Sequence, residues 1–232
     1  EKIISISKRG KELLSLMQNS IAPSVFAIGD MPAVKRSLAL QLFGGVSRIN
    51  PDNTRLRGDI HILLLGDPGV AKSQLLSYIN QISPRGRFTS GGGTTTAGLT
   101  AAVVRDSFAD GRFSLEAGAL VLSDMGMCAV DEFDKMSPED QGAMHEAMEQ
   151  QQIHINKAGI SATMPTRCAV LAAANPKAGR FVAVDPYDEK TYIHKQINLP
   201  PALISRFDLV WMIRDDVIPI RDRKIGEHII KV

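Results

Sequence analysis

The sequence Gly66-Asp67-Pro68-Gly69-Val70-Ala71-Lys72-Ser73 directly follows an apolar run at residues 60–65. An apolar run that leads through a glycine-containing turn into a Lys-Ser pair predicts a strand, a phosphate-binding loop and a helix, in that order. Such a loop holds phosphate because consecutive backbone N–H groups point into one concavity at the N-terminus of a helix. This feature therefore favours an α/β fold and predicts binding of a nucleoside triphosphate.

Each residue type in this loop has an expected task. Lys72 brings a positive charge to the β- and γ-phosphates, and the hydroxyl of Ser73 is a ligand for Mg²⁺. The general pattern has glycine before the lysine, whereas this chain has Ala71. The alternative is an ordinary strand-to-helix turn that carries a surface lysine. The residues expected to contact the nucleotide are Gly66, Asp67, Pro68, Gly69, Val70, Ala71, Lys72, Ser73 and Gln74.

Two adjacent carboxylates, Asp131 and Glu132, follow the apolar run at residues 127–130. If this strand lies beside the phosphate loop, Asp131 is placed to hold Mg²⁺ through its water shell. Glu132 is then placed to orient and deprotonate the attacking water. The alternative is an acidic strand end that faces solvent. Catalysis of ATP hydrolysis is thus expected of Lys72 and Glu132 together.

Two further polar residues follow later in the chain. Asn175 ends an apolar run, and its amide is suited to holding the same water, although Asn-Pro is also a common start of a turn. Arg206 lies in the sequence Ser205-Arg206-Phe207-Asp208. A guanidinium neutralises the charge that develops in phosphoryl transfer and is often supplied by a neighbouring subunit. The alternative for Arg206 is a structural ion pair with Asp208.

The length of 232 residues suits one α/β domain. Net charge is only +2, so any surface that binds nucleic acid must be local. Cys128 and Cys168 lie in apolar runs and are expected to be buried free thiols. No run of 18 apolar residues occurs, so no membrane span is expected. The chain does not begin with Met, and we expect it to be a piece of a longer protein.

Periodicity predicts helices at 8–18, 33–43, 71–82, 138–150 and 203–207 and strands at 60–65, 87–90, 127–130, 168–173 and 209–213. Ser137 and Pro138 mark a strong helix start. Hairpins are expected at 103–115, turning at Asp110-Gly111, and at 153–162, with loops at 47–58 and 177–196. Since strands alternate with helices and several are apolar throughout, a parallel sheet covered on both faces is expected.

Four segments together resemble the minichromosome maintenance (MCM) helicases of the AAA+ ATPases: 66–73 with alanine before the lysine, 130–136 (Val-Asp-Glu-Phe-Asp-Lys-Met), 174–176 and 199–208. The resemblance extends over roughly residues 20–215. It implies a three-layer α/β/α P-loop NTPase with a five-stranded parallel sheet, a helix-2 insert near residues 100–115 and a presensor-1 β-hairpin at 153–162.

The resemblance also implies roles for single residues. Lys72 and Ser73 resemble the Walker A pair, Asp131 and Glu132 the Walker B pair, Asn175 sensor 1, and Arg206 an arginine finger that acts in trans. Lys157, at the hairpin tip, is implied to face DNA in a central channel. Ala22 lies in the segment near the adenine, at residues 20–26. Glu149 and Gln150 end a helix that reaches toward a neighbouring site.

The expected activity is therefore ATP hydrolysis with Mg²⁺, coupled to DNA translocation by a hexameric ring inside the cell, on the chromosome. Residues 1–216 are expected to be the AAA+ core and 217–232 the start of a lid. The family's zinc-binding and oligonucleotide-binding N-terminal part and most of the lid are expected to be absent. Gly92 stands where the family usually has lysine. The alternatives are a nucleotide-binding assembly or loading component without helicase function, or another AAA+ enzyme such as a chelatase or a transcription activator.

Overall fold

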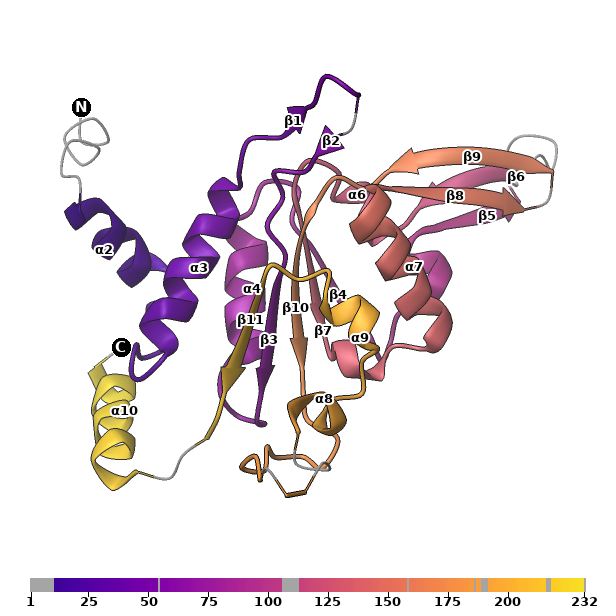
Figure 1. The fold of residues 1–232 in the computed structure, drawn as a ribbon. Coiled ribbons are helices and arrows are strands. Elements are labelled where there is room, and N and C mark those ends of the chain that lie inside the picture. The colour runs from indigo at the N-terminus through magenta and orange to yellow at the C-terminus, as the bar shows by residue number, and fades with distance from the viewer. Residues whose placement is uncertain are drawn as a thin grey trace.

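The computed structural model describes residues 11–53, 55–105, 113–157, 159–185, 187–188, 192–215 and 218–231. A five-stranded sheet lies between two layers of helices (Figure 1). The order across the sheet is β11 (Leu209–Ile213), β3 (Ile62–Gly66), β10 (Ala169–Ala174), β7 (Met127–Asp131) and β4 (Arg87–Ser90). All neighbouring pairs are parallel, so the expected five-stranded parallel sheet is confirmed.

Both faces of the sheet are buried, which explains why its central strands are apolar throughout. Successive side chains of a strand point to opposite faces. In β3, Ile62 and Leu64 pack in one apolar cluster, whereas Leu63 and Leu65 pack in another. Every residue of β3 and β10 is buried. This arrangement needs a helical layer on each side.

One face is covered by α3 (Met31–Phe43) and α4 (Lys72–Ile82), and α2 (Lys11–Ser20) packs against the outer side of α3 (Figure 1). Helix α3 carries proline in its first turn, and it is followed by Gly44, whose positive φ of 62° glycine adopts readily. The buried side chains on this face include Val34 and Leu38 of α3 and Leu75 and Ile79 of α4.

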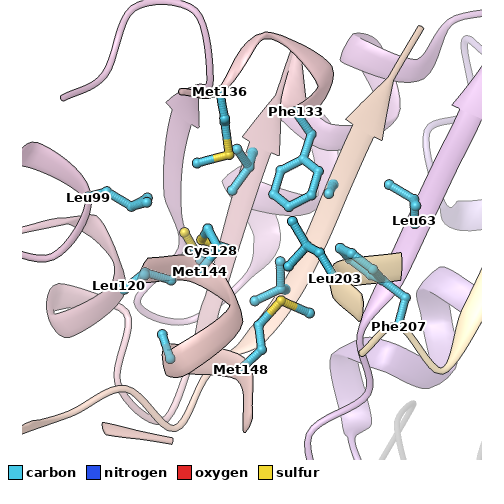
Figure 2. Packing of buried hydrophobic residues seen from close by; sticks show 14 of the residues in the cluster. Leu63, Leu99, Leu120, Cys128, Phe133, Met136, Met144, Met148, Leu203 and Phe207 are labelled. Carbon is cyan, nitrogen blue, oxygen red and sulfur yellow. The ribbon is translucent and has the colours of Figure 1, made fainter. Parts of the chain in front are cut away.

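The other face is covered by the short 3₁₀ helix η1 (Phe133–Lys135), α7 (Pro138–Gln150) and α9 (Pro201–Ile204) (Figure 2). Phe133 and Phe207 meet edge to face, with ring centroids 5.7 Å apart. Ser137 caps α7, because its Oγ accepts a hydrogen bond from the backbone N–H of Asp140 at 3.2 Å. The predicted start of this helix is confirmed.

Two β-hairpins extend from the same side of the molecule (Figure 1). The first joins β5 (Ala101–Arg105) to β6 (Phe113–Ala117), and the second joins β8 (Gln152–Lys157) to β9 (Ile160–Pro165). Both were expected; the predicted turn at residues 110–111 lies outside the described residues. The short helices α5 (Thr96–Leu99) and α6 (Ala119–Leu122) flank the first hairpin in sequence.

Several boundaries differ from the prediction. The 47–58 stretch, expected to be a loop, contains the small pair β1 (Arg48–Ile49) and β2 (Arg55–Leu56), and the 177–196 stretch ends in α8 (Ile193–Gln196). Helix α9 begins at Pro201 rather than at residue 203, since proline is favoured in a first turn. The last element is α10 (Pro219–Lys231).

The two cysteines and the lengths of the helices bear on two further expectations. Cys128 and Cys168 are free and buried, as expected. Within the described ranges, no helix combines the length and the apolar character that crossing a membrane requires.

Candidate nucleotide-binding site

The loop between β3 and α4 has the backbone shape of an anion-binding turn. Gly66 fits tightly, because a Cβ there would lie 2.8 Å from the carbonyl oxygen of Ile213. Gly69 and Ala71 are both left-handed, with φ of 87° and 62°. For a residue with a Cβ, this conformation costs about 1–2 kcal/mol. The geometry therefore explains why the general pattern has glycine before the lysine, and it shows that Ala71 adopts the same conformation.

The loop presents consecutive N–H donors. The first helical hydrogen bond of α4 runs from Leu75 N to Ala71 O, at 3.1 Å. In the part of the chain that the structure describes, no acceptor pairs with the backbone N–H groups of residues 69–74. Unpaired donors at a helix N-terminus attract anions. The loop thus fits the phosphates of a nucleotide.

Lys72 lies just below this concavity and is only 7% exposed. Its Nζ donates hydrogen bonds to the carbonyl oxygens of Gly66 and Asp67, at 2.8 and 2.7 Å. Burial lowers the pKa of Lys72, while the nearby carboxylates of Asp131, Asp67 and Asp134 act to raise it. The alternative of an exposed surface lysine is wrong. An anionic phosphate at the loop would favour the charged ammonium further.

Asp131 and Glu132 lie at the carboxyl edge of the sheet, where β7 ends. Asp131 is in register with Ser90 of β4, and its Oδ1 accepts from the backbone N–H of Glu132 at 2.8 Å. The Glu132 carboxylate accepts from Lys135 Nζ and from Ser90 Oγ, the latter at 3.1 Å. Lys135, then Ser90, lower the pKa of Glu132 by these hydrogen bonds. Both acids are partly buried rather than fully solvated.

Gly92 lies directly beside Glu132. A Cβ at position 92 would be 3.1 Å from Glu132 Oε2 and 3.4 Å from Cδ of Lys135. A lysine at this position, as is usual in the resembling family, would thus start next to the Glu132 carboxylate. In this chain Lys135 supplies the cation that contacts it.

Asn175 follows β10, which lies between β3 and β7. Ala174 is paired with Leu65 of β3, so Asn175 leaves the sheet between the loop and the two carboxylates. Its backbone N–H donates to Asp134 Oδ1 at 2.9 Å. No partner for its side-chain amide occurs among the described residues, so that amide is available to a water or a phosphate. The expected turn also forms, since Gly179 N donates to Pro176 O.

Asp67 makes structural contacts that its place in the motif did not reveal. Its carboxylate is buried, and Oδ1 accepts from Phe181 N at 2.8 Å while Oδ2 accepts from Asp215 N at 3.0 Å. Asp67 was predicted as a nucleotide ligand. That contact stays a prediction; the carboxylate of Asp67 accepts from two backbone N–H groups, which joins the loop to the chain after β10 and to the segment after β11.

A cavity of about 310 Å³ adjoins the phosphate loop. It lies between residues 24–31, the loop and the start of α4, the end of β11, and α10; its lining includes Val25, Phe26, Val70, Gln74, Ile213 and Ile225. Such a size and a mainly apolar lining suit a nucleotide base. Ala22, predicted to lie near the base, is buried and is not among the residues that line this cavity. Sequence reasoning missed the contributions of β11 and α10, whose only sign was a helix-like run at the end of the chain.

Arg206 lies at the other end of the sheet. The next strand begins where Asp208 N donates to His61 O, so Arg206 lies near the amino end of β3, away from Gly66. Its Nη2 is 2.9 Å from Glu149 Oε1, and its Nε donates to His145 Nε2 at 3.2 Å. The alternative of a pair with Asp208 is wrong, because Asp208 pairs with Arg57 at 2.9 Å.

The remaining predicted residues are less defined. Lys157 ends β8 opposite Ile160, and its side chain lies outside the described residues, so its contact with DNA stays a prediction. Gln150 lines a hollow of about 720 Å³ next to Glu149. Ser73 is exposed at the start of α4. In the described ranges no three His, Cys, Asp or Glu residues cluster as metal ligands. Mg²⁺ commonly takes one or two protein ligands plus phosphate oxygens, and Ser73 with Asp131 fits that chemistry.

A parallel sheet whose carboxyl edge carries a phosphate loop, a buried lysine and two carboxylates defines a P-loop nucleotide-binding domain. The family model described as the MCM P-loop domain matches residues 1–232. The chain belongs to this family.

The chain is also similar to curated relatives in its sequence. It is 50% identical to "Minichromosome maintenance protein MCM" of Saccharolobus solfataricus over 92% of this chain and 29% of that protein. It is 47% identical to "DNA replication licensing factor MCM7" of Arabidopsis thaliana over 100% of this chain and 31% of that protein. For "DNA replication licensing factor mcm7" of Xenopus tropicalis the identity is 50%, over 90% of this chain and 28% of that protein. The chain therefore spans less than a third of the length of these relatives.

Proposed function

We propose that this chain is the ATP-hydrolysing motor of a ring-shaped DNA helicase that acts in chromosome replication. The observation that carries the proposal is the arrangement at the carboxyl edge of the sheet, where the phosphate loop with the buried Lys72 follows β3 and the carboxylates of Asp131 and Glu132 lie at the end of β7, with β10 between the two strands. The names of the relatives, which are replication licensing factors, support the same process. Residues 1–216 are the core of this motor, and 217–232 begin its lid.

The residues of this chain divide the chemistry among them. The N–H groups of the loop and Lys72 hold the phosphates, and Ser73 with Asp131 holds Mg²⁺. ATP with Mg²⁺ supplies the phosphoanhydride that is cleaved. Glu132 takes the proton of the attacking water, and the amide of Asn175 orients that water. Lys135 and Ser90 each donate to one oxygen of the Glu132 carboxylate, which makes it a weaker base but leaves each oxygen a further lone pair for the proton of water.

Arg206 completes a neighbouring site rather than its own. The Arg206 end of the sheet and the phosphate loop are separated by the length of β3, about 17 Å at 3.3 Å per residue. With half-sites at opposite ends of each subunit, the Arg206 end of one subunit can meet the phosphate-loop end of the next. Such head-to-tail contacts close into rings when the rotation between subunits allows it. The proposed assembly is a hexamer.

DNA is the proposed partner of the projecting hairpin β8–β9. Net charge of the chain is only +2, so contact with DNA depends on local groups such as Lys157 repeated around the ring. Binding through phosphates is salt-sensitive and tolerant of sequence. The place of action is the chromosome inside the cell.

The shared site can be tested by complementation in the full-length parent protein. Glu132→Gln and Arg206→Ala each remove half of one site, and each homogeneous variant should lose nearly all ATP hydrolysis while it still binds nucleotide. In a random mixture of the two, about a quarter of the interfaces combine an intact Glu132 with an intact Arg206. Recovery of a corresponding fraction of activity is expected. A mixture as inactive as its components would contradict a site built from two chains.

A second candidate is a nucleotide-binding assembly component with little turnover. The contacts of Glu132 with Lys135 and Ser90 favour it, since they engage the carboxylate that should activate water. Nucleotide binding without hydrolysis in the full-length protein, under conditions that support ring assembly, would favour this candidate over the motor.

A further inference from the structure

Lys35 is a buried cation that the proposed chemistry does not use. It lies in α3 and is only 2% exposed. Its Nζ donates to the carbonyl oxygens of Val25 at 2.6 Å and Ala22 at 3.0 Å. No carboxylate within the described ranges forms an ion pair with it. Burial of an ammonium group is costly unless its hydrogen bonds are satisfied, so these carbonyls have a defined structural purpose.

The two carbonyls belong to a compact turn at residues 20–26. Val25 N donates to Ala22 O at 2.9 Å, and Ala22 adopts a left-handed φ of 41°. The hydroxyl of Tyr78, from the helix that follows the phosphate loop, donates to Ser20 O at 2.7 Å. Lys35 therefore holds the middle of the turn, and Tyr78 holds its beginning.

This turn forms a wall of the cavity beside the phosphate loop. Val25 and Phe26 line the cavity, together with Val70 and Ala71 of the loop. The ring of Phe26 lies 4.9 Å from the ring of His228 in α10, and His228 Nε2 lies 2.9 Å from Pro23 O. The wall thus contacts α4 through Tyr78 and α10 through His228.

We propose that Lys35 is a positioning residue for the base of the bound nucleotide. By holding the carbonyls of Ala22 and Val25, it fixes the wall that packs against an aromatic base, and it contributes nothing to the grip on the phosphates. The inference rests on the proposed function, since it assumes that a nucleoside triphosphate occupies the loop and the cavity together. It predicts that replacing Lys35 weakens the binding of ligands that carry a base, and leaves the binding of ligands without a base nearly unchanged.

The test compares two ligands that share the triphosphate and differ in the base. Dissociation constants for a non-hydrolysable ATP analogue and for inorganic tripolyphosphate, both with Mg²⁺, are measured on the full-length protein and on Lys35→Met. The analogue should bind about tenfold more weakly to the variant, whereas tripolyphosphate should change less than about twofold. Arg36→Met is the matched control, because Arg36 is the exposed neighbour in the same helix, and it should change neither constant.

A second variant keeps the test decisive if Lys35→Met does not fold. Phe26→Ala removes one side chain of the wall and leaves the buried cation in place, and it should show the same selective loss for the analogue. Equal weakening of both ligands in Lys35→Met would show a general structural role and overturn the inference. So would an unchanged ratio of the two constants. Failure of the unaltered protein to bind either ligand would instead contradict the proposed function itself.

Discussion

Arg206 is ion-paired to Glu149 of its own chain, with Nη2 2.9 Å from Oε1. The two side chains are 35% and 44% exposed, so water screens their attraction. Exposed pairs of this kind contribute about 0–1 kcal/mol. An arginine held this weakly can exchange its partner, as the proposed role of Arg206 in a neighbouring subunit requires.

Removing this internal partner should make Arg206 easier to deliver. In the full-length protein, Glu149→Gln is expected to raise ATP hydrolysis per chain at limiting protein concentration by up to about fivefold, the factor that corresponds to 1 kcal/mol. The measurement is the rate as a function of protein concentration. Glu146→Gln, one turn earlier in α7, is the control and should leave the rate unchanged. A marked fall in Glu149→Gln would show that Glu149 itself serves the site.

His61 should make stability depend on pH in the acidic range. It is 1% exposed, its Nδ1 accepts from Val170 N at 3.0 Å, and burial, followed by the charge of Arg57, lowers its pKa to about 3. The unfolded value of 6.5 is higher, so the unfolded chain binds the proton first as pH falls. Stability from this group is complete above pH 6.5 and is lost toward pH 3.

The free energy of unfolding should therefore fall by about 2 kcal/mol between pH 6.5 and pH 5. Urea titrations at a series of pH values measure it. In His61→Gln the free energy of unfolding at pH 6.5 should be lower, because a buried hydrogen-bonded side chain is replaced. It should also change less between pH 6.5 and pH 5, because glutamine does not titrate. Parallel curves for the two proteins would mean that His61 does not titrate as described.

Ala71 should be a site where glycine stabilises the fold. Its φ of 62° costs a residue with a Cβ about 1–2 kcal/mol, and the greater freedom of glycine in the unfolded chain offsets part of that gain. Ala71→Gly is expected to add about 1 kcal/mol, which raises Tm by about 2–4 °C for a chain of this size. Ala143→Gly, within α7, should do the opposite by about 1 kcal/mol. Calorimetry measures the Tm of both variants. A lower Tm for Ala71→Gly than for the unaltered protein would show that Ala71 is not strained.

Asp67 should matter for the integrity of the site more than for direct contact with phosphate. Asp67→Ala removes the acceptor of Phe181 N and of Asp215 N, and the expected cost is about 1–3 kcal/mol of unfolding free energy. Asp67→Asn keeps one acceptor oxygen and should lie between alanine and the unaltered protein. Denaturant midpoints measure this order. Stability equal to that of the unaltered protein in both variants would contradict the role.

The contact between Lys135 and Glu132 should be visible in the pH profile of hydrolysis. Lys135 is the largest cause of the lowered pKa of Glu132, so Lys135→Met should raise that pKa. The acidic limb of the kcat profile should move to higher pH, since a base must be deprotonated to act. Lys177→Met, an exposed lysine elsewhere, is the control. An unmoved limb would indicate that this contact is absent in the working enzyme.

Much of the sheet was predictable because its information is local. The apolar runs of β3, β7 and β10 predict strands that are buried on both faces. The Lys-Ser pair after a glycine-containing turn predicts the position of the phosphate loop. Carboxyl ends of neighbouring parallel strands share one edge, so the gathering of Asp131, Glu132 and Asn175 near the loop followed from sheet order. Their roles toward a ligand remain predictions.

The missed features depend on contacts between distant parts of the chain. Arg206 pairs with Glu149 rather than with Asp208 two residues away, because the end of α7 packs beside α9. A lysine in a helix is usually exposed, and nothing local reveals that carbonyls at positions 22 and 25 enclose Lys35. Residues of α10 line the cavity, but they are far from the phosphate loop in the sequence, so only the folded chain brings them to it.

A single residue, Gln151, separates the end of α7 from the start of β8. Its side chain donates to Asp59 Oδ2 at 2.6 Å, and its carbonyl accepts from Thr166 N at 2.9 Å. These two hydrogen bonds fix the position of the connection between α7 and β8. The helix that bears Glu149 and the strand that ends at Lys157 are thus joined through one anchored residue, and a change in the orientation of one would be passed directly to the other. The six residues of β8 extend about 20 Å, so any change in the direction of the strand at Gln151 is magnified at its far end.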